Sequence, residues 1–119
     1  MIIAVDFDGT CVTHEYPRMG RNIGAQAVLY KLIERGDQLI LYTMRSGDRL
    51  EAAVRWFREN RIPLFGVNEN PTQKEWTTSP KIYAHLYIDD AAFGAPLSKG
   101  REGERPHLNW TIVAEALFP

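Results

Sequence analysis

Short apolar runs alternate with longer amphipathic segments along this chain. Each apolar run is bounded by polar, charged or glycine residues, which is typical of a strand that is buried on both faces of a sheet. The runs that we interpret as strands cover residues 2–5, 38–43, 64–67 and 86–89. The segments in which apolar residues recur at helical spacing cover residues 23–35, 46–60 and 110–117.

The helical spacing also predicts which residues face the core. For the first helix these are Ala27, Leu29, Leu32 and Ile33, and for the second Leu50, Ala53, Val54 and Phe57. Gly36 is expected to end the first helix, and Ser46 and Asn109 are expected to cap the starts of the other two. The remaining segments are polar or broken by Gly and Pro, and we predict loops over residues 11–22, 68–80 and 91–106.

The order of these elements predicts the type of sheet. Strand, helix, strand, helix, strand and strand is the pattern of an α/β protein with a parallel sheet, in which the crossovers are right-handed. Ligands of such sheets bind beyond the carboxyl ends of the strands. The residues that follow each predicted strand are therefore the first candidates for function.

Composition and charge narrow the class of protein. The 119 residues suffice for one domain, covering 1–119, and 45% of them are apolar, enough for one core. A net charge of −1 indicates no general attraction to nucleic acid or to a membrane surface. One cysteine, Cys11, allows no internal disulfide. No signal peptide or membrane span is recognisable, so we expect a cytoplasmic protein.

The first predicted strand ends in two carboxylates, in the run Asp6-Phe7-Asp8-Gly9-Thr10. Residues two apart on an extended chain point to the same side, so Asp6 and Asp8 should converge while Phe7 faces away. Two like charges held that close favour a bound proton or a metal cation. The alternative is an ordinary turn, because Asp and Gly are common in turns.

Further polar residues follow or precede the other strands. Thr43 ends the second strand and is followed by Met44 and Arg45, and Asp89-Asp90 end the fourth. Lys81 lies a few residues ahead of the fourth strand. Each of these is a weak signal alone, because Thr and Asp at strand ends usually form turns and a lysine is usually solvated. Their order along the chain is what gives them weight.

That order resembles the haloacid dehalogenase superfamily of phosphatases and phosphotransferases over roughly residues 1–93. Asp6-Phe7-Asp8-Gly9-Thr10 is similar to its first motif, and Thr43 to the second. Lys81 is similar to the third motif and Asp89-Asp90 to the fourth. The resemblance implies a three-layer, Rossmann-like parallel sheet with helices on both faces. It also implies a phosphatase that hydrolyses a phosphomonoester with the help of Mg²⁺.

The resemblance also implies a role for each matching residue. Asp6 is the expected nucleophile, which forms an aspartyl-phosphate, and Asp8 is the expected general acid and base. Thr43 is expected to bind a phosphate oxygen, and Lys81 to offset phosphate charge and keep Asp6 ionised. The Mg²⁺ ligands are expected among Asp6, Asp8, Asp89 and Asp90. Of these, Asp8 would use its backbone carbonyl, Asp89 is favoured as a direct ligand, and Asp90 would bind directly or through water.

The sequence departs from many members of that superfamily in having no room for a cap domain. The intervals after the first motif and between Thr43 and Lys81 are too short, so we expect an open site. An open site suits a bulky phosphorylated substrate, or a phosphorylated small molecule enclosed by a homo-oligomer partner. Lys81 is only eight residues before Asp89, and Lys74 is the alternative for its role.

Several interpretations remain open at the level of sequence. Arg45 either reaches a substrate phosphate or forms a salt bridge outside the site. Polar loop residues form a group that could contact substrate, although each alone reads as solvated or packed: His14, Tyr16, Arg18 and Arg21. The same site residues also suit a phosphotransferase or a phosphate- and Mg²⁺-binding regulatory module. A receiver-like signalling domain fits less well, because here the candidate nucleophile closes the first strand.

Overall fold

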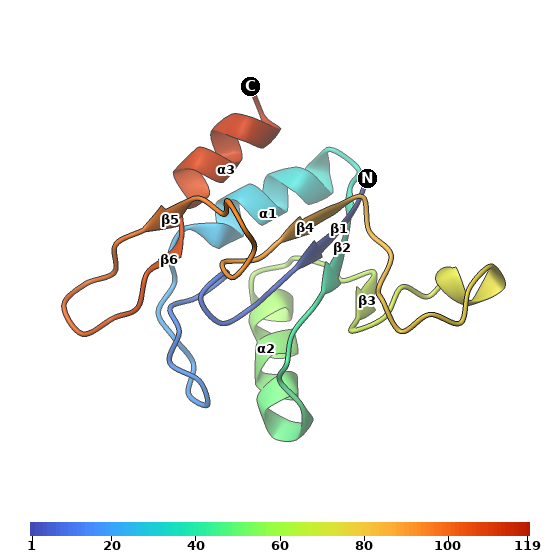
Figure 1. Ribbon diagram of the computed structural model, residues 1–119, viewed down its shortest axis with the longest axis horizontal. Helices are drawn as coiled ribbons and strands as arrows, with labels where there is room; N and C mark the ends of the chain where they lie inside the picture. The colour runs from blue at the N-terminus through green and yellow to red at the C-terminus, as the bar shows by residue number, and fades with distance from the viewer.

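The structure is a computed structural model that describes residues 1–119. It contains a four-stranded parallel sheet in the order β3-β2-β1-β4 (Figure 1). The strands are short: β1 (Ile2–Val5), β2 (Gln38–Leu41), β3 (Gly66–Val67) and β4 (Leu86–Ile88). The parallel sheet with alternating helices confirms the α/β class. Because Val5 lies between Leu41 of β2 and Ile88 of β4, the residues after β1 emerge in the middle of the carboxyl edge.

Three α-helices flank the sheet. They are α1 (Ala25–Glu34), α2 (Gly47–Glu59) and α3 (Trp110–Leu117), and a short 3₁₀ helix, η1 (Gln73–Glu75), lies in the segment between β3 and β4. Figure 1 shows α1 and α3 side by side, and α2 apart from them. None of the α-helices has both the length and the apolar composition needed to cross a bilayer.

The core forms where the strands meet the helices. Ile3, Ala4 and Val5 of β1 are fully buried, as expected for a central strand covered on both faces. Phe7, which follows β1, packs edge-on against Trp56 of α2, with ring centroids 5.7 Å apart, and also contacts Phe57. Phe7 therefore anchors the turn that follows β1, residues 6–10, in the core.

The predicted helix ends are confirmed at α1 and α3. Gly36 follows α1 with a φ of +98°, and the N–H groups of Gly36 and Asp37 donate to the carbonyls of Ile33 and Leu32, which closes the helix in a left-handed C-terminal turn. At α3, the side-chain oxygen of Asn109 accepts a hydrogen bond from the N–H of Ile112. Ser46 does precede α2, but its side chain makes no capping hydrogen bond.

Other details differ from the sequence predictions. Ala27 is exposed, because α1 buries the face that carries Ala25, Val28, Leu29 and Leu32. The predicted loop 91–106 contains β5 (Leu97–Ser98), which pairs antiparallel with β6 (His107–Leu108) just beyond it. That pair also contacts a distant segment, because the N–H of Leu108 donates to the carbonyl of Gly9 in the turn after β1.

Candidate active site at the carboxyl edge of the sheet

A cleft of about 520 Å³ opens at the carboxyl edge of the sheet. Of the six residues to which the sequence assigned a catalytic or metal-binding role, five line it: Asp6, Asp8, Thr43, Asp89 and Asp90. They come from the ends of β1, β2 and β4, which are neighbours in the sheet. The expectation that strand-end residues meet at one edge is therefore met for these five.

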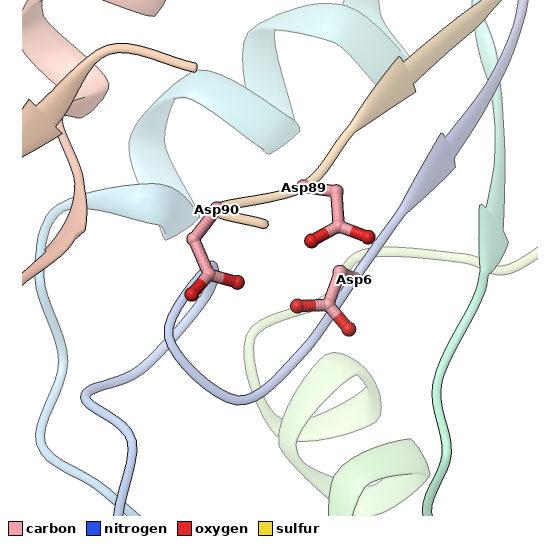
Figure 2. Close-up of side chains that lie close together, drawn as sticks. All are labelled: Asp6, Asp89 and Asp90. Carbon is pink, nitrogen blue, oxygen red and sulfur yellow. The ribbon is translucent and has the colours of Figure 1, made fainter. Parts of the chain in front are cut away.

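Three carboxylates form a compact cluster in this cleft, which we call the acidic triad: Asp6, Asp89 and Asp90. One oxygen from each lies within 4.8 Å of the others, and all three residues are half-buried (Figure 2). The backbone holds the two sides of the triad in register, because the N–H of Asp6 donates to the carbonyl of Ile88 over 2.9 Å. Three carboxylates in one small volume offer the oxygen ligands that a hard cation prefers.

Thr10 ties the turn after β1 to the end of β4. Its hydroxyl oxygen lies 2.8 Å from Asp6 Oδ2 and 3.0 Å from Asp90 Oδ1, and it accepts the N–H of Asp90 over 3.0 Å. A hydroxyl has a single proton, so it donates to one of the two carboxylates at a time. Thr10 is fully buried, and its carbonyl accepts a hydrogen bond from the Trp110 ring nitrogen. Thr10 therefore connects the triad to the core.

Gly9 is required by the same turn. Its φ is +83°, and a Cβ placed there would lie 2.5 Å from Asp90 Oδ2. A larger residue would both strain the backbone and push Asp90 out of the triad. The glycine in the first motif therefore allows the close approach of the two strand ends.

The triad disfavours ionisation of Asp6. Burial raises the pKa of Asp6 to about 8, and the negative charge of Asp89 and the hydrogen bond with Asp90 add to this rise. A divalent cation between the three carboxylates would oppose each of these effects. The donor set and its excess negative charge therefore fit a Mg²⁺ ion held by Asp6, Asp89 and Asp90.

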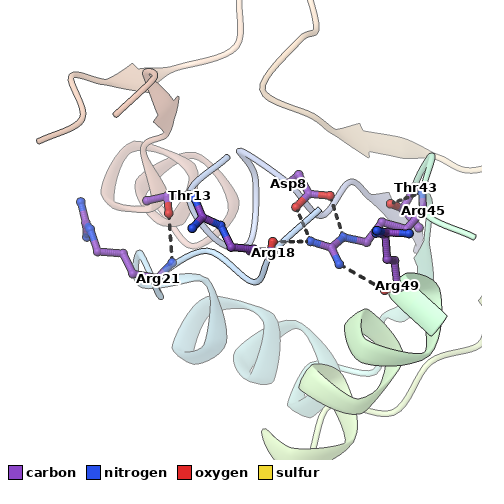
Figure 3. A network of polar contacts seen from close by, with 7 residues as sticks. All are labelled: Asp8, Thr13, Arg18, Arg21, Thr43, Arg45 and Arg49. Carbon is purple, nitrogen blue, oxygen red and sulfur yellow. Dashed lines mark hydrogen bonds and ion pairs between the residues drawn. The ribbon is translucent and has the colours of Figure 1, made fainter. Parts of the chain in front are cut away.

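The side chain of Asp8 does not join the triad, although the sequence predicted that Asp6 and Asp8 converge. Both of its oxygens accept hydrogen bonds from the Arg45 guanidinium, at 2.8 Å from Nε and 2.7 Å from Nη2 (Figure 3). The physical reason is charge: a buried guanidinium beside Asp8 binds its carboxylate more favourably than a cluster of like charges would. Of the two sequence interpretations of Arg45, the structure shows a salt bridge, and that salt bridge lies within the cleft.

Thr43 is placed at the cleft by two backbone contacts. Its N–H donates to Asn68 Oδ1 over 2.8 Å, and its hydroxyl oxygen accepts the N–H of Arg45 over 3.1 Å. Because the hydroxyl accepts here, its own proton remains available to a ligand. The N–H groups of Asp8 and Met44 donate to no group of the protein, so two backbone donors are also available near this edge.

The structure does not bring Lys81 into the cleft. Its side chain is exposed, and its Nζ lies 5.9 Å from the ring centroid of Tyr87. Lys74 lines a separate hollow within residues 68–82. Both lysines belong to the segment between β3 and β4, which projects away from the sheet before it returns to the amino end of β4 (Figure 1).

Arg105 is a cleft residue that sequence reasoning missed. It comes from the connection between β5 and β6 and lines the cleft without forming a salt bridge. A lone arginine in a loop rich in Gly and charge has no pattern that would identify it. Of the four loop residues considered as a group, His14 and Tyr16 line the cleft, whereas Arg21 is paired with Glu104 through two hydrogen bonds of 3.0 and 2.8 Å.

Comparisons with known proteins give one informative result. No family model and no curated protein matches the chain. Among solved structures, the chain is similar to a conserved protein from Bacteroides thetaiotaomicron, with 34% sequence identity and a TM-score of 0.81. The similarity covers 98% of this chain and 88% of that one. At that identity and coverage, the chain belongs to the same family as this conserved Bacteroides thetaiotaomicron protein.

Proposed function

We propose that this protein is a Mg²⁺-dependent phosphatase of the haloacid dehalogenase superfamily, which hydrolyses a phosphomonoester through an aspartyl-phosphate on Asp6. The observation that carries the proposal is the acidic triad at the carboxyl edge of a parallel sheet, with its three oxygens within 4.8 Å of one another. Asp8 and Thr43 lie in the same cleft. Three of the four motifs that suggested this superfamily, all except that of Lys81, contribute residues to this cleft.

The proposed metal ligands are the carboxylates of Asp6, Asp89 and Asp90, together with the backbone carbonyl of Asp8. When bound, Mg²⁺ would supply the positive charge that offsets the carboxylates and the substrate phosphate. The remaining chemistry belongs to side chains of the protein, because a phosphoryl group that moves in two steps needs a nucleophile and a group that carries a proton.

In the first step, a carboxylate oxygen of Asp6 forms a bond to phosphorus while the bond from phosphorus to the ester oxygen breaks. Asp8, protonated for this step on a lone pair that Arg45 leaves free, gives that proton to the departing oxygen. In the second step, a water oxygen attacks the same phosphorus, Asp8 takes the proton of that water, and inorganic phosphate leaves Asp6. Each step passes one proton through Asp8, which is a contribution of about 10²- to 10⁴-fold for a well-placed general acid or base.

The phosphate oxygens have donors on the other side of the cleft. The free proton of the Thr43 hydroxyl and the unused N–H groups of Asp8 and Met44 can bind them. Donors that are already held in place stabilise the charge of the transition state without a cost of reorganisation.

We also propose that the fold is the three-layer core of that superfamily without a cap domain. The segment between β1 and α1 and the segments between Thr43 and β4 contain only short loops, α2, β3 and η1. The cleft is therefore open to a bulky phosphorylated substrate, or to a smaller one that a second subunit helps to enclose.

A panel of phosphorylated metabolites, assayed with Mg²⁺ and with a chelator, tests this function. We expect release of inorganic phosphate that the chelator abolishes. Asp6→Asn should lower kcat by at least about 10⁴-fold, the size of loss seen when a catalytic nucleophile is removed. The matched control is Asp48→Asn, which makes the same chemical change at an exposed position of α2 outside the cleft.

A second variant tests the covalent step. Asp8→Asn should retain a labelled phosphoryl group on the protein, because without a base the aspartyl-phosphate is hydrolysed slowly. Full activity in chelator would contradict the metal assignment. Normal turnover in Asp6→Asn would contradict the covalent mechanism.

A further inference from the structure

Asp8 and Arg45 form the most buried ion pair of the molecule. Their side chains are 12% and 1% exposed, respectively. A buried charge is costly to leave unpaired, so each group depends on the other for its position. Arg45 is not part of any of the four sequence motifs, and it stands two residues after Thr43.

The guanidinium of Arg45 is held by several hydrogen bonds. Four of its five N–H donors are used: two bind Asp8, one binds the carbonyl of Arg18 and one binds the carbonyl of Arg49 (Figure 3). Its guanidinium carbon also lies over two aromatic rings, 5.1 Å from the ring centroid of Phe7 and 5.5 Å from that of Tyr16. A group fixed in this way has one orientation.

This arrangement argues against Arg45 as a ligand of the substrate phosphate. An arginine that binds phosphate presents two parallel N–H donors to it. The fork of Arg45 that would do so, formed by Nε and Nη2, is already filled by the Asp8 carboxylate. While it holds Asp8, Arg45 therefore cannot offer this fork to a phosphate, and its strongest link to the reaction is through Asp8.

We propose that Arg45 is a positioning residue that separates Asp8 from the acidic triad and holds its carboxylate in place for proton transfer. The inference rests on the proposed phosphatase function. A fourth free carboxylate beside the triad would compete to bind the cation, whereas one bound by a guanidinium stays apart from it. A carboxylate has about four lone-pair directions, and Arg45 takes one on each oxygen, so each oxygen keeps a second direction for a proton.

The loop over residues 16–18 also helps to hold Arg45. It supplies the carbonyl of Arg18 and the ring of Tyr16 to Arg45, and Tyr16 also lines the cleft. The loop that follows the nucleophile is thus connected to the proton carrier through a single guanidinium.

Kinetics of a double-mutant cycle test this inference. The variants are Asp8→Asn, Arg45→Gln and the two combined, with Arg55→Gln on the exposed face of α2 as the matched control. If Arg45 acts only through Asp8, the combined variant should be within about threefold of Asp8→Asn in kcat/KM, because effects within one functional unit are not additive. Losses that multiply would overturn the inference and give Arg45 an independent role.

A comparison of substrates with different leaving groups separates a role in proton transfer from a purely structural role. The ester oxygen of p-nitrophenyl phosphate leaves with little need of a proton, whereas that of an alkyl phosphate needs one. Arg45→Gln should therefore lower kcat/KM by about 10²-fold or more for the alkyl phosphate and by less than about tenfold for p-nitrophenyl phosphate. Equal losses on both substrates would contradict a role in proton transfer.

Arg45→Lys keeps the inference testable if Arg45→Gln does not fold. Lysine keeps the charge but cannot bind both oxygens of Asp8, so it should show the same dependence on leaving group, with a smaller loss. A wild-type protein without phosphatase activity would instead contradict the proposed function. The pair is then tested by urea unfolding, in which the combined variant should shift the midpoint by less than the sum of the two single shifts.

Discussion

Asp6 lies half-buried between two other carboxylates, and this position determines how it titrates. Burial and the charge of Asp89 raise its pKa from 3.8 to about 8. In the unfolded chain the carboxyl group is solvated and ionises at its ordinary value. Folding and ionisation of Asp6 therefore oppose each other in the absence of a cation.

The stability of the metal-free protein should consequently decrease as pH rises from about 4 to about 8. In that window folded Asp6 holds a proton that the unfolded chain has lost, so each pH unit lowers the free energy of unfolding by at most about 1.4 kcal/mol from this source. Urea unfolding in chelator at about pH 5 and pH 8 measures the change. Asp6→Asn should reduce the slope and Asp48→Asn should not; an unchanged slope in Asp6→Asn would assign it to another group.

Arg105 and Lys81 offer a second comparison between single residues. Arg105 lines the cleft and forms no salt bridge, whereas Lys81 lies outside it, against Tyr87. We expect Arg105→Ala to raise KM for a phosphorylated substrate by about tenfold, roughly the loss of one charge-assisted hydrogen bond. Lys81→Ala, assayed in parallel, should change KM less. A larger rise in KM for Lys81→Ala than for Arg105→Ala would instead support the role that the third motif predicted for Lys81.

At the scale of the elements, the sequence predicted those features that depend on residues close together in the chain. The apolar run of β1, the C-terminal turn at Gly36 and the cap at Asn109 each depend on neighbouring residues, and all three were found. The pairing of β5 with β6 was missed, and the hydrogen bond that ties Leu108 to Gly9 joins it to a segment about a hundred residues earlier. Strands of two residues have no periodicity to detect.

The candidate site also contains some residues whose position could be predicted from the sequence and others whose position could not. Asp6, Asp89 and Thr43 could be placed together because parallel strands bring their carboxyl ends to one edge. The path of the segment that carries Lys81 could not be predicted, because it is set by the side-chain amides of Asn70 and Gln73, which bind backbone groups of the same segment. The salt bridge of Asp8 with Arg45 likewise joins residues that no sequence spacing relates.

The two helix caps give a matched test at this scale. Asn109→Ala should lower the free energy of unfolding by about 1 kcal/mol, because it removes the acceptor for the N–H of Ile112 at the start of α3. Ser46→Ala should cost clearly less, because Ser46 makes no such bond at α2. Urea unfolding of both variants measures the difference. Equal losses would show that the cap of Asn109 contributes nothing beyond the intrinsic preference of the position.

At the scale of the whole molecule, the acidic triad joins the central strand to an edge strand. β1 lies inside the sheet, whereas β4 has a neighbour on one side only. The residues after the two strands meet through Thr10 and through the carboxylates of Asp6 and Asp90. A cation bound by both ends would add a link that exists only in the folded state, so it should stabilise the entire chain.

Mg²⁺ should therefore raise the melting temperature, and by more at higher pH. At one hundred times its Kd, a ligand of the folded state adds about 2.7 kcal/mol, or about 10 °C for a domain of this size. Binding must displace the proton from Asp6, whose pKa is about 8, so the shift at a fixed Mg²⁺ concentration should be smaller near pH 6 than near pH 8. Thermal unfolding with and without Mg²⁺ at the two pH values measures this. Asp89→Asn should abolish the shift while Asp48→Asn retains it, and an equal shift at both pH values would mean that the ion binds without Asp6.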